Sequence, residues 1–177
     1  MKFTQQKIDG LFLINPNPYE DERGVFHRSY CEEELRSIGI DFSVKQGNIS
    51  ENFKKYTLRG FHYQKSPSKE SKIISCLSGS IFNVVIDLRA GSDTIYHSVS
   101  INISAKMKQS ILIPAGCANA FLTTKDDTLV HYYMSDYFSN DTYSGIRYDD
   151  PMFSIEWPHS PVVISDKDLN FPNYLRN

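Results

Sequence analysis

The chain has 177 residues, 40% of them hydrophobic and 13% aromatic, and its formal net charge at pH 7 is -2. This length predicts one domain, residues 1–177, that is large enough to bury a core. The absence of a basic block argues against a nucleic-acid partner, and no apolar run approaches the roughly 20 residues that span a bilayer. The first ten residues lack the apolar stretch of a signal peptide. The three cysteines form no CxxC pair, which favours reduced thiols in the cytoplasm.

One short helix is predicted over Cys31–Ser37, because its acidic residues come first and Arg36 comes last, as the helix dipole favours. Most later segments are rich in β-branched and aromatic residues and are separated by GS, AGSD, PAG and KDD turns. The strands predicted from this pattern are Lys72–Leu77, Ile81–Leu88, His97–Ile103, Ser110–Pro114 and Leu129–Phe138. Short strands with little helix predict an antiparallel β-sandwich or barrel. The proline-rich C-terminal segment is expected to wrap around it.

The strand predicted over Leu129–Phe138 indicates which of its side chains face the interior. Successive side chains of a strand point to opposite faces, so Val130, Tyr132 and Met134 share one face. That face is the more uniformly apolar of the two. We therefore expect Tyr132 to point into the barrel and His131 to point outward.

Residue spacing argues against a metal site or a nucleophilic enzyme. The five histidines contain no HxH, HxxxH or HExxH pair, and Asn119 stands in the turn PAGCAN where a barrel of this kind often has a histidine ligand. A zinc or iron site needs three or four nitrogen, sulfur or carboxylate ligands, so no metal is predicted. The sequence also has no GxSxG elbow, no P-loop and no GxGxxG motif, so no nucleotide cofactor is indicated.

Acid–base catalysis is the remaining type of enzyme chemistry that the sequence allows. It requires a base, a group that orients the base, and an acid on the far side of the substrate. His62 has the most suitable intrinsic pKa for a base, although a lone histidine is more often a core or surface residue. Tyr132 alone is equally compatible with core packing, and Asp168 with a turn. The residues alone leave an acid–base enzyme and a non-catalytic domain as alternatives.

Eight ordered motifs carry a resemblance to one family. LRGFHYQ, at residues 58–64, resembles the L-R-G-[LM]-H-Y-Q signature of the dTDP-4-dehydrorhamnose 3,5-epimerases. The remaining motifs follow in the family's order and are DERGVF, QGNIS, KIISCLSGSIFNVVIDLRAGS, IPAGCANAF, YYMSDYF, DPMFSIEWP and SDKD. The resemblance covers nearly the whole chain. It implies an all-β fold, a cupin-type jelly-roll β-barrel or sandwich with one or two short helices.

The resemblance also implies an activity and the residues that perform it. The family epimerises nucleotide-diphospho-4-keto sugars without metal or organic cofactor, using the acidity of the protons next to the C4 ketone. The matching positions make His62 the base, Tyr132 the acid on the opposite face, and Asp168 the partner of the histidine. A carboxylate on Nδ1 of His62 would leave Nε2 as the base. Lys72 matches the lysine that stabilises the enolate oxygen.

The same matching implies a set of substrate-binding residues. Arg59 matches an arginine that binds the diphosphate, where a guanidinium fork fits the geometry. The full set of implied contact positions is Arg23, Phe26, Arg28, Gln46, Asn48, Arg59, Asn119 and Lys167. Family members are generally homodimers in which an N-terminal strand joins the partner's sheet. Arg23 and Phe26 would then complete the pocket of the other subunit.

Several positions depart from the family pattern. Asn83, Asn119 and Arg28 stand where the family has aspartate, histidine and glutamate, while Tyr143 and Phe138 replace a glutamate and a tyrosine. These changes represent either drift or a different substrate. An arginine near a base edge can recognise guanine, so a GDP-linked sugar is an alternative to a dTDP-linked one, although Arg28 is also compatible with a solvated surface.

The sequence therefore leaves several activities open. The main expectation is 3,5-epimerisation of a nucleotide-linked deoxyhexose or heptose for surface polysaccharide. An enzyme that inverts only C3 or only C5 of a GDP-linked sugar is the second reading. A ketoisomerase, or a non-catalytic sugar-nucleotide-binding cupin, belongs to a different class.

Overall fold

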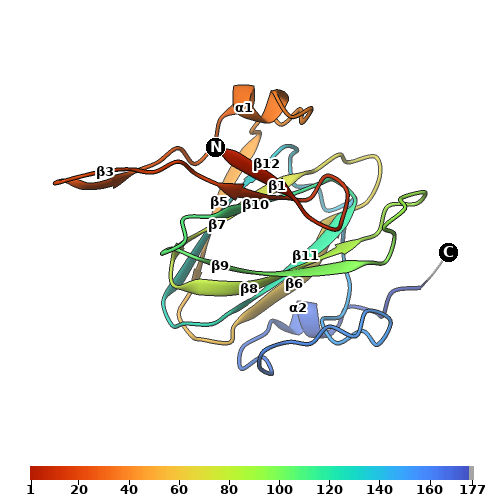
Figure 1. The fold of residues 1–177 in the computed structure, drawn as a ribbon. Coiled ribbons are helices and arrows are strands. Elements are labelled where there is room, and N and C mark those ends of the chain that lie inside the picture. Colours follow the sequence, from red (N-terminus) through yellow and green to blue (C-terminus); the bar gives the residue numbers. More distant parts are fainter. Residues whose placement is uncertain (176–177) are drawn as a thin grey trace.

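The computed structural model describes residues 1–175 and contains two β-sheets that face each other across the core (Figure 1). In the six-stranded sheet the order is β1 (Lys2–Gln5), β2 (Phe12–Asn15), β10 (Ser110–Ile113), β7 (Lys72–Ser78), β12 (Thr128–Met134) and β5 (Gln46–Asn52). In the five-stranded sheet the order is β13 (Tyr143–Gly145), β6 (Leu58–Gln64), β11 (Cys117–Thr123), β8 (Ser80–Asp87) and β9 (Ser98–Ser104). All pairings between these strands are antiparallel, which confirms the predicted all-β jelly roll.

The helix and the five strands predicted by residue range agree with the structure to within one residue except at one strand end, whereas β1, β2, β5, β6, β11 and β13 were not predicted. Helix α1 (Glu32–Arg36) lies inside the predicted Cys31–Ser37 segment, and a second short helix, α2 (Asp166–Leu169), lies near the C-terminus. Strand β12 ends at Met134, four residues before the predicted end. Beyond it, the Asp136 carboxylate accepts hydrogen bonds from the Ser68 hydroxyl and from the N–H groups of Lys69 and Tyr137. These bonds hold the chain in a turn.

The core lies between the two sheets and consists of aliphatic side chains from both. Ile74, Ile111 and Val130 come from the six-stranded sheet, while Ile81 and Val85 face them from the five-stranded sheet, and all are at most 2% exposed. Burial of each such side chain contributes about 1.5–3 kcal/mol. The inward position of Val130 confirms the predicted phase of β12 and places Tyr132, two residues later, against the same cluster.

The outer faces of both sheets are covered by other segments. Leu35 of α1 packs with Ile73 and Leu112 on the six-stranded sheet. The C-terminal segment lies against the five-stranded sheet (Figure 1), where Trp157 contacts the ring of Phe61. The segment that was expected to wrap the barrel thus packs against the outer face of the five-stranded sheet. None of the helices within residues 1–175 is long and apolar enough to cross a bilayer.

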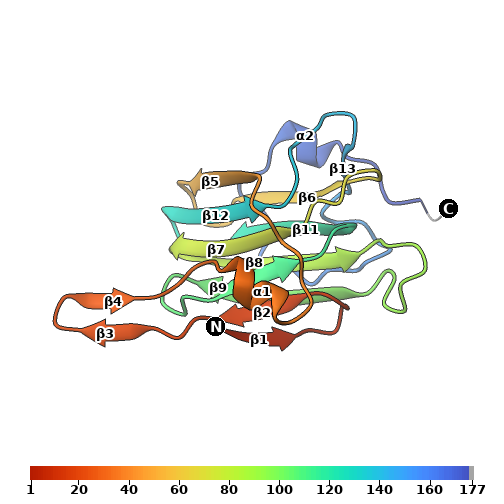
Figure 2. The same ribbon diagram turned by 90° about the horizontal axis from the view of Figure 1, so that it is seen from above.

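A hairpin projects from the body of the molecule. Its strands are β3 (Tyr19–Asp21) and β4 (Gly24–Phe26), and Figure 2 shows that it extends well beyond the two sheets. The side chains of Tyr19 and Phe26 are 64% and 76% exposed. The hairpin thus exposes aromatic side chains together with charged ones such as Arg23.

Candidate active site

His62 and Asp168 form the central contact of the candidate site. His62 lies in β6, and its Nε2 is 2.7 Å from Oδ1 of Asp168. The second carboxylate oxygen, Oδ2, accepts a hydrogen bond of 3.0 Å from the backbone N–H of Gly60. Asp168 is held in place by α2, because the hydroxyl of the N-cap residue Ser165 accepts the Asp168 backbone N–H. These bonds fix the position of the Asp168 carboxylate, which contacts the His62 ring at Nε2.

The protonation of this pair follows from its surroundings. Burial alone would raise the pKa of Asp168, but the hydrogen bonds from His62 and Gly60 outweigh it and hold the pKa below its usual value. An ionised Asp168 places the imidazole proton on Nε2 of His62. Nδ1 forms no hydrogen bond with residues 1–175 and is the free nitrogen. The sequence-based expectation that Asp168 pairs with Nδ1 is therefore wrong, because α2 brings the carboxylate to the Nε2 edge of the ring.

A cavity of about 270 Å³ lies beside this pair, between the two sheets. His62 borders it from β6 of the five-stranded sheet, and Tyr132 borders it from β12 of the six-stranded sheet. The complete lining consists of Gln46, Asn48, His62, Tyr63, Gln64, Glu70, Lys72, Tyr132, Met134, Phe138 and Tyr143. The cavity thus brings together three of the four predicted catalytic residues, and Asp168 reaches it through His62.

Tyr132 occupies the cavity in the form of a neutral phenol. Burial raises the pKa of Tyr132, with Arg59 opposing the rise and Glu70 adding to it. Its hydroxyl forms no hydrogen bond within residues 1–175, so it is available to a bound molecule. The neighbouring Tyr143 has its pKa raised to about 12, by burial first and then by Asp168 and Tyr132. Both hydroxyls therefore remain protonated at neutral pH.

Lys72 has a partner that the sequence did not reveal. Its Nζ lies 3.1 Å from Oε1 of Glu70, and Glu70 Oε2 accepts a hydrogen bond of 2.5 Å from Gln64 Nε2. Both Glu70 and Gln64 line the cavity. Asn83, which replaces the family aspartate expected to pair with Lys72, contacts Asn119 instead. Strand alternation could have identified Gln64, because it lies two residues from His62 in the same strand, β6.

The predicted polar contact residues lie around the cavity in different ways. Gln46 and Asn48 line it directly, and Gln46 Nε2 donates to Asn48 Oδ1 at 3.3 Å. Arg59 is exposed three residues before His62, with its Nε bonded to Asn52 Oδ1 at 2.8 Å. Lys167 is also exposed, and its Nζ lies 4.0 Å from the ring centroid of the cavity residue Tyr143. These two cations are placed to attract an anionic ligand toward the cavity.

Besides Arg59 and Lys167, the other four predicted substrate-binding residues also do not line the cavity of their own chain. Phe26 and Arg23 lie on the projecting hairpin, where Arg23 forms an ion pair of 2.6 Å with Asp21. Arg28 is paired with Glu34 at 2.7 Å. Asn119 lies beside His62 in the strand register but is buried.

The buried amide of Asn119 is engaged within the sheet. Its Nδ2 donates to Oδ1 of Asn83 at 2.8 Å and to the carbonyl of Val84 at 3.0 Å. Because the amide points to β8, it is not among the groups that border the cavity. Within residues 1–175, no group of three or more His, Cys, Asp or Glu side chains is arranged to hold a metal ion.

The chain is similar to known proteins along nearly its whole length. The family model described as dTDP-4-dehydrorhamnose 3,5-epimerase matches residues 5–175. A curated dTDP-4-dehydrorhamnose 3,5-epimerase from Methanothermobacter thermautotrophicus is 33% identical over 179 residues, covering 99% of this chain and 96% of the relative. The protein of the same name from Escherichia coli K12 is 31% identical over 170 residues, covering 95% and 91%.

Two solved structures have the same fold and contain ligands. The Bacillus anthracis dTDP-4-dehydrorhamnose 3,5-epimerase, with TDP and PPi bound, has a TM-score of 0.94 and 33% identity, covering 98% of this chain and 99% of that one. A 3′-monoepimerase from Streptomyces bikiniensis, in complex with dTDP-quinovose, has a TM-score of 0.88 and 29% identity, covering 95% and 85%.

Proposed function

Because the chain belongs to the dTDP-4-dehydrorhamnose 3,5-epimerase family, we propose that it inverts C3 and C5 of a nucleotide-diphospho-4-keto sugar. The chain is accordingly an isomerase of the epimerase class. One observation carries the proposal for its site: His62, which is paired with Asp168, and the phenol of Tyr132 border a single cavity from opposite sheets.

In the first step, Nδ1 of His62 removes the proton from the carbon next to the ketone. Asp168 holds the Nε2 proton of the ring and stabilises the imidazolium that forms. The electron pair of the broken C–H bond moves toward the C4 oxygen and gives an enolate. Lys72 places its ammonium in the same cavity and stabilises the negative charge on that oxygen. Glu70 keeps this ammonium in position through its ion pair.

In the second step, Tyr132 returns a proton to the same carbon from the other side. The phenol is protonated at neutral pH because burial raises its pKa. Since His62 and Tyr132 belong to opposing sheets, a sugar ring held between them loses its proton on one face and gains one on the other. Proton exchange with solvent then restores both side chains, so the reaction needs no cofactor.

The nucleotide in this proposal is dTDP, and the sugar is a deoxyhexose used for surface polysaccharide. The solved relatives that contain TDP or dTDP-quinovose support the choice of nucleotide. Arg59 and Lys167 supply positive charge for the diphosphate. The guanine alternative rested on Arg28, whose guanidinium is occupied by Glu34. Calorimetric titration with dTDP and GDP separates the two, and tighter binding of GDP would contradict the proposal.

The proposed enzyme acts as a homodimer. The projecting hairpin exposes Tyr19 and Phe26, and large exposed apolar surfaces commonly mark protein contacts. The edge strand β1 could pair with another chain, which would also remove an exposed sheet edge. We therefore propose that Arg23 and Phe26 complete the cavity of the partner subunit. A cytoplasmic location fits the three free cysteines.

Inversion of C3 alone is a second candidate activity. The similarity to a 3′-monoepimerase favours it, as does the Asn83–Asn119 pair, which replaces an acid and a base by neutral amides. The two activities differ in which carbon exchanges its proton with solvent.

Incubation of the dTDP-4-keto-6-deoxy sugar in D2O, followed by NMR, tests both activities. Deuterium at C3 and C5 together with inversion at both centres supports the main proposal. Deuterium confined to C3 supports the second candidate. Failure of the wild-type protein to exchange either proton would contradict both, and His62→Asn serves as the inactive control.

A further inference from the structure

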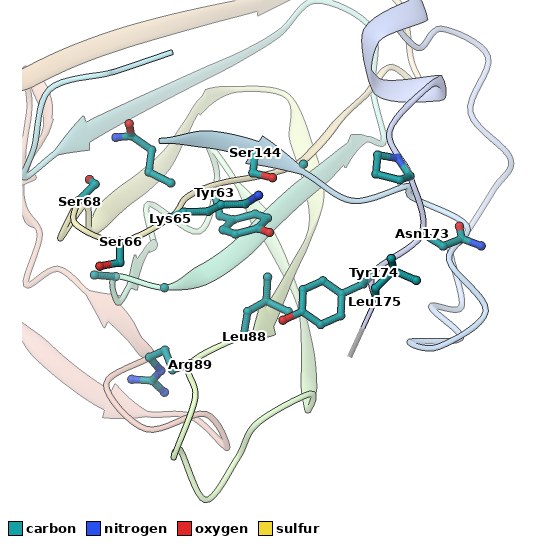
Figure 3. Close-up of a pocket in the computed structure, with 15 residues that line it drawn as sticks. Tyr63, Lys65, Ser66, Ser68, Leu88, Arg89, Ser144, Asn173, Tyr174 and Leu175 are labelled. Carbon is teal, nitrogen blue, oxygen red and sulfur yellow. The ribbon is translucent and has the colours of Figure 1, made fainter. Parts of the chain in front are cut away.

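A second cavity, of about 610 Å³, lies outside the catalytic one (Figure 3). Its size falls within the range of small-molecule sites. Its wall is formed by the end of β6 and the loop after it, by the loop after β8, and by the C-terminal segment, with Lys65, Leu88 and Tyr174 as examples. Among the described residues, the linings of the two cavities have Tyr63 and Gln64 in common. The function proposed above assigns it no role.

The charge of this second cavity is positive. The ammonium group of Lys65 forms no ion pair or hydrogen bond with residues 1–175. Arg89 is the other lining cation, and its charge is balanced by Asp87 at 2.7 Å. Among residues 1–175, those that line the cavity include no carboxylate side chain. The hydroxyls of Ser66 and Ser144 also have no partner in the described part of the chain, so they can donate to an anion.

The same cavity has an aromatic wall. Figure 3 shows the rings of Tyr63 and Tyr174 beside it, with Leu88 close to Tyr174. The Tyr174 ring is supported from behind, because its centroid lies 5.8 Å from that of Tyr96 and 5.9 Å from that of Phe153. Supported aromatic rings provide stacking surfaces for a planar group at little cost in side-chain entropy.

We propose that this cavity is a second, non-catalytic binding site for a small aromatic anion of nucleoside-monophosphate size. Lys65 binds the anionic group, Ser66 and Ser144 donate hydrogen bonds to it, and the rings of Tyr63 and Tyr174 contact the planar part. The site is separate from the catalytic one, because His62 faces the interior while Lys65 lies beyond the end of β6. The ligand of this second cavity can therefore be a molecule other than the substrate.

Calorimetric titration with phenyl phosphate, in a buffer free of phosphate, tests this site. The Lys65→Ala variant should bind the probe at least tenfold more weakly than the wild-type protein. Lys69→Ala, which removes an exposed lysine from the same loop outside the cavity lining, should change binding by less than twofold. Arg59→Ala should leave the Lys65-dependent part of the binding unchanged, because Arg59 does not line this cavity. Methyl phosphate, which has no ring, should bind more weakly than phenyl phosphate.

Three results would overturn the proposal. The first is the absence of saturable binding by the wild-type protein. The second is an equal loss of affinity in Lys65→Ala and Lys69→Ala, which would indicate nonspecific attraction to surface lysines. The third is a loss confined to Arg59→Ala, which would place the probe in the catalytic cavity. None of these measurements depends on turnover, so failure of the proposed epimerase activity would leave the test intact.

Discussion

His62 and Tyr132 border the same cavity from two different sheets, His62 from β6 and Tyr132 from β12. Packed sheets lie about 10 Å apart, which leaves room for one sugar ring between their side chains. A base and an acid on one sheet would exchange a proton on one face of the ring. Because His62 and Tyr132 lie on opposing sheets, removal of a proton by one and donation of a proton by the other inverts the carbon.

Replacement of Tyr132 by phenylalanine should separate proton removal from inversion. His62 can still remove the proton and return a solvent-derived one to the same face. In D2O we expect recovered substrate to contain deuterium while epimerised product falls by at least 10²-fold, a typical contribution of one acid–base group. NMR of the recovered sugar measures both quantities.

The matched control for this experiment is His62→Asn, which removes the base. It should lose both exchange and inversion, while its affinity for dTDP stays within about twofold of the wild-type value. If Tyr132→Phe inverts the sugar at the wild-type rate, Tyr132 is not the acid.

The Asp168→Asn variant should be affected in two separable ways. An amide in place of the carboxylate no longer fixes the tautomer of His62, and in a comparable triad this change lowers kcat by about 10⁴. The pKa of Asp168 is lowered in the folded protein, so its ionisation stabilises the fold above the unfolded-state pKa of about 4. That contribution is lost as the pH falls through the lower folded-state pKa.

Urea unfolding of both proteins between pH 7 and pH 2 measures this contribution. The free energy of unfolding of the wild-type protein, relative to Asp168→Asn, should decrease as the pH falls below about 4. A difference that stays constant over this range would show that the His62–Asp168 contact does not depend on the charge of the carboxylate.

Sequence patterns predicted β7, β8, β9, β10 and β12 and the inward face of Tyr132, because alternation of side chains is a local property. Motif matching identified His62, Lys72 and Asp168 as a set. The contact of Asp168 with Nε2 depends on where α2 packs against β6, which no local pattern encodes. The Glu70 partner of Lys72 was missed for a similar reason, since an isolated acid has no signature until the fold places Gln64 beside it.

Gly60 is required by the close approach of β6 to β11. Its φ is +112°, and a Cβ atom there would lie 2.5 Å from the carbonyl oxygen of Asn119 and 2.7 Å from Cα of Ala120. Neither atom can move without shifting the strand, so Gly60→Ala should cost about 4 kcal/mol or more in the free energy of unfolding. Gly39→Ala is the matched control, because Gly39 has a φ of +82° and no atom within 4 Å.

The Gly39→Ala variant should cost only about 1–2 kcal/mol, the penalty for a left-handed alanine. Denaturant titration of the two variants isolates the steric part as their difference. Equal costs would mean that β11 relaxes around the new methyl group.

The Lys72–Glu70 pair should show strong coupling in a double-mutant cycle. The two side chains are 15% and 3% exposed, so loss of either one leaves the other as a buried, unpaired charge. Glu70→Gln and Lys72→Met should each cost about 3–5 kcal/mol in the free energy of unfolding. The double variant should cost clearly less than the sum of the two. Additive costs would indicate that the pair is hydrated and contributes little.

The hairpin predicts complementation between two inactive variants. If Arg23 and Phe26 act in the partner's cavity, the double variant Arg23→Ala/Phe26→Ala has intact catalytic groups but presents a defective hairpin. The His62→Asn protein has an intact hairpin but no base. Both homodimers should be strongly impaired.

A mixed dimer of these two variants should regain one functional site. In that site, the intact His62 of one subunit meets the intact hairpin of the other. Co-expression with two different affinity tags allows purification of the mixed dimer, and its rate per dimer should approach half that of the wild-type protein. Mixed dimers no more active than the two parents would mean that the exposed hairpin serves the cavity of its own chain, or neither cavity.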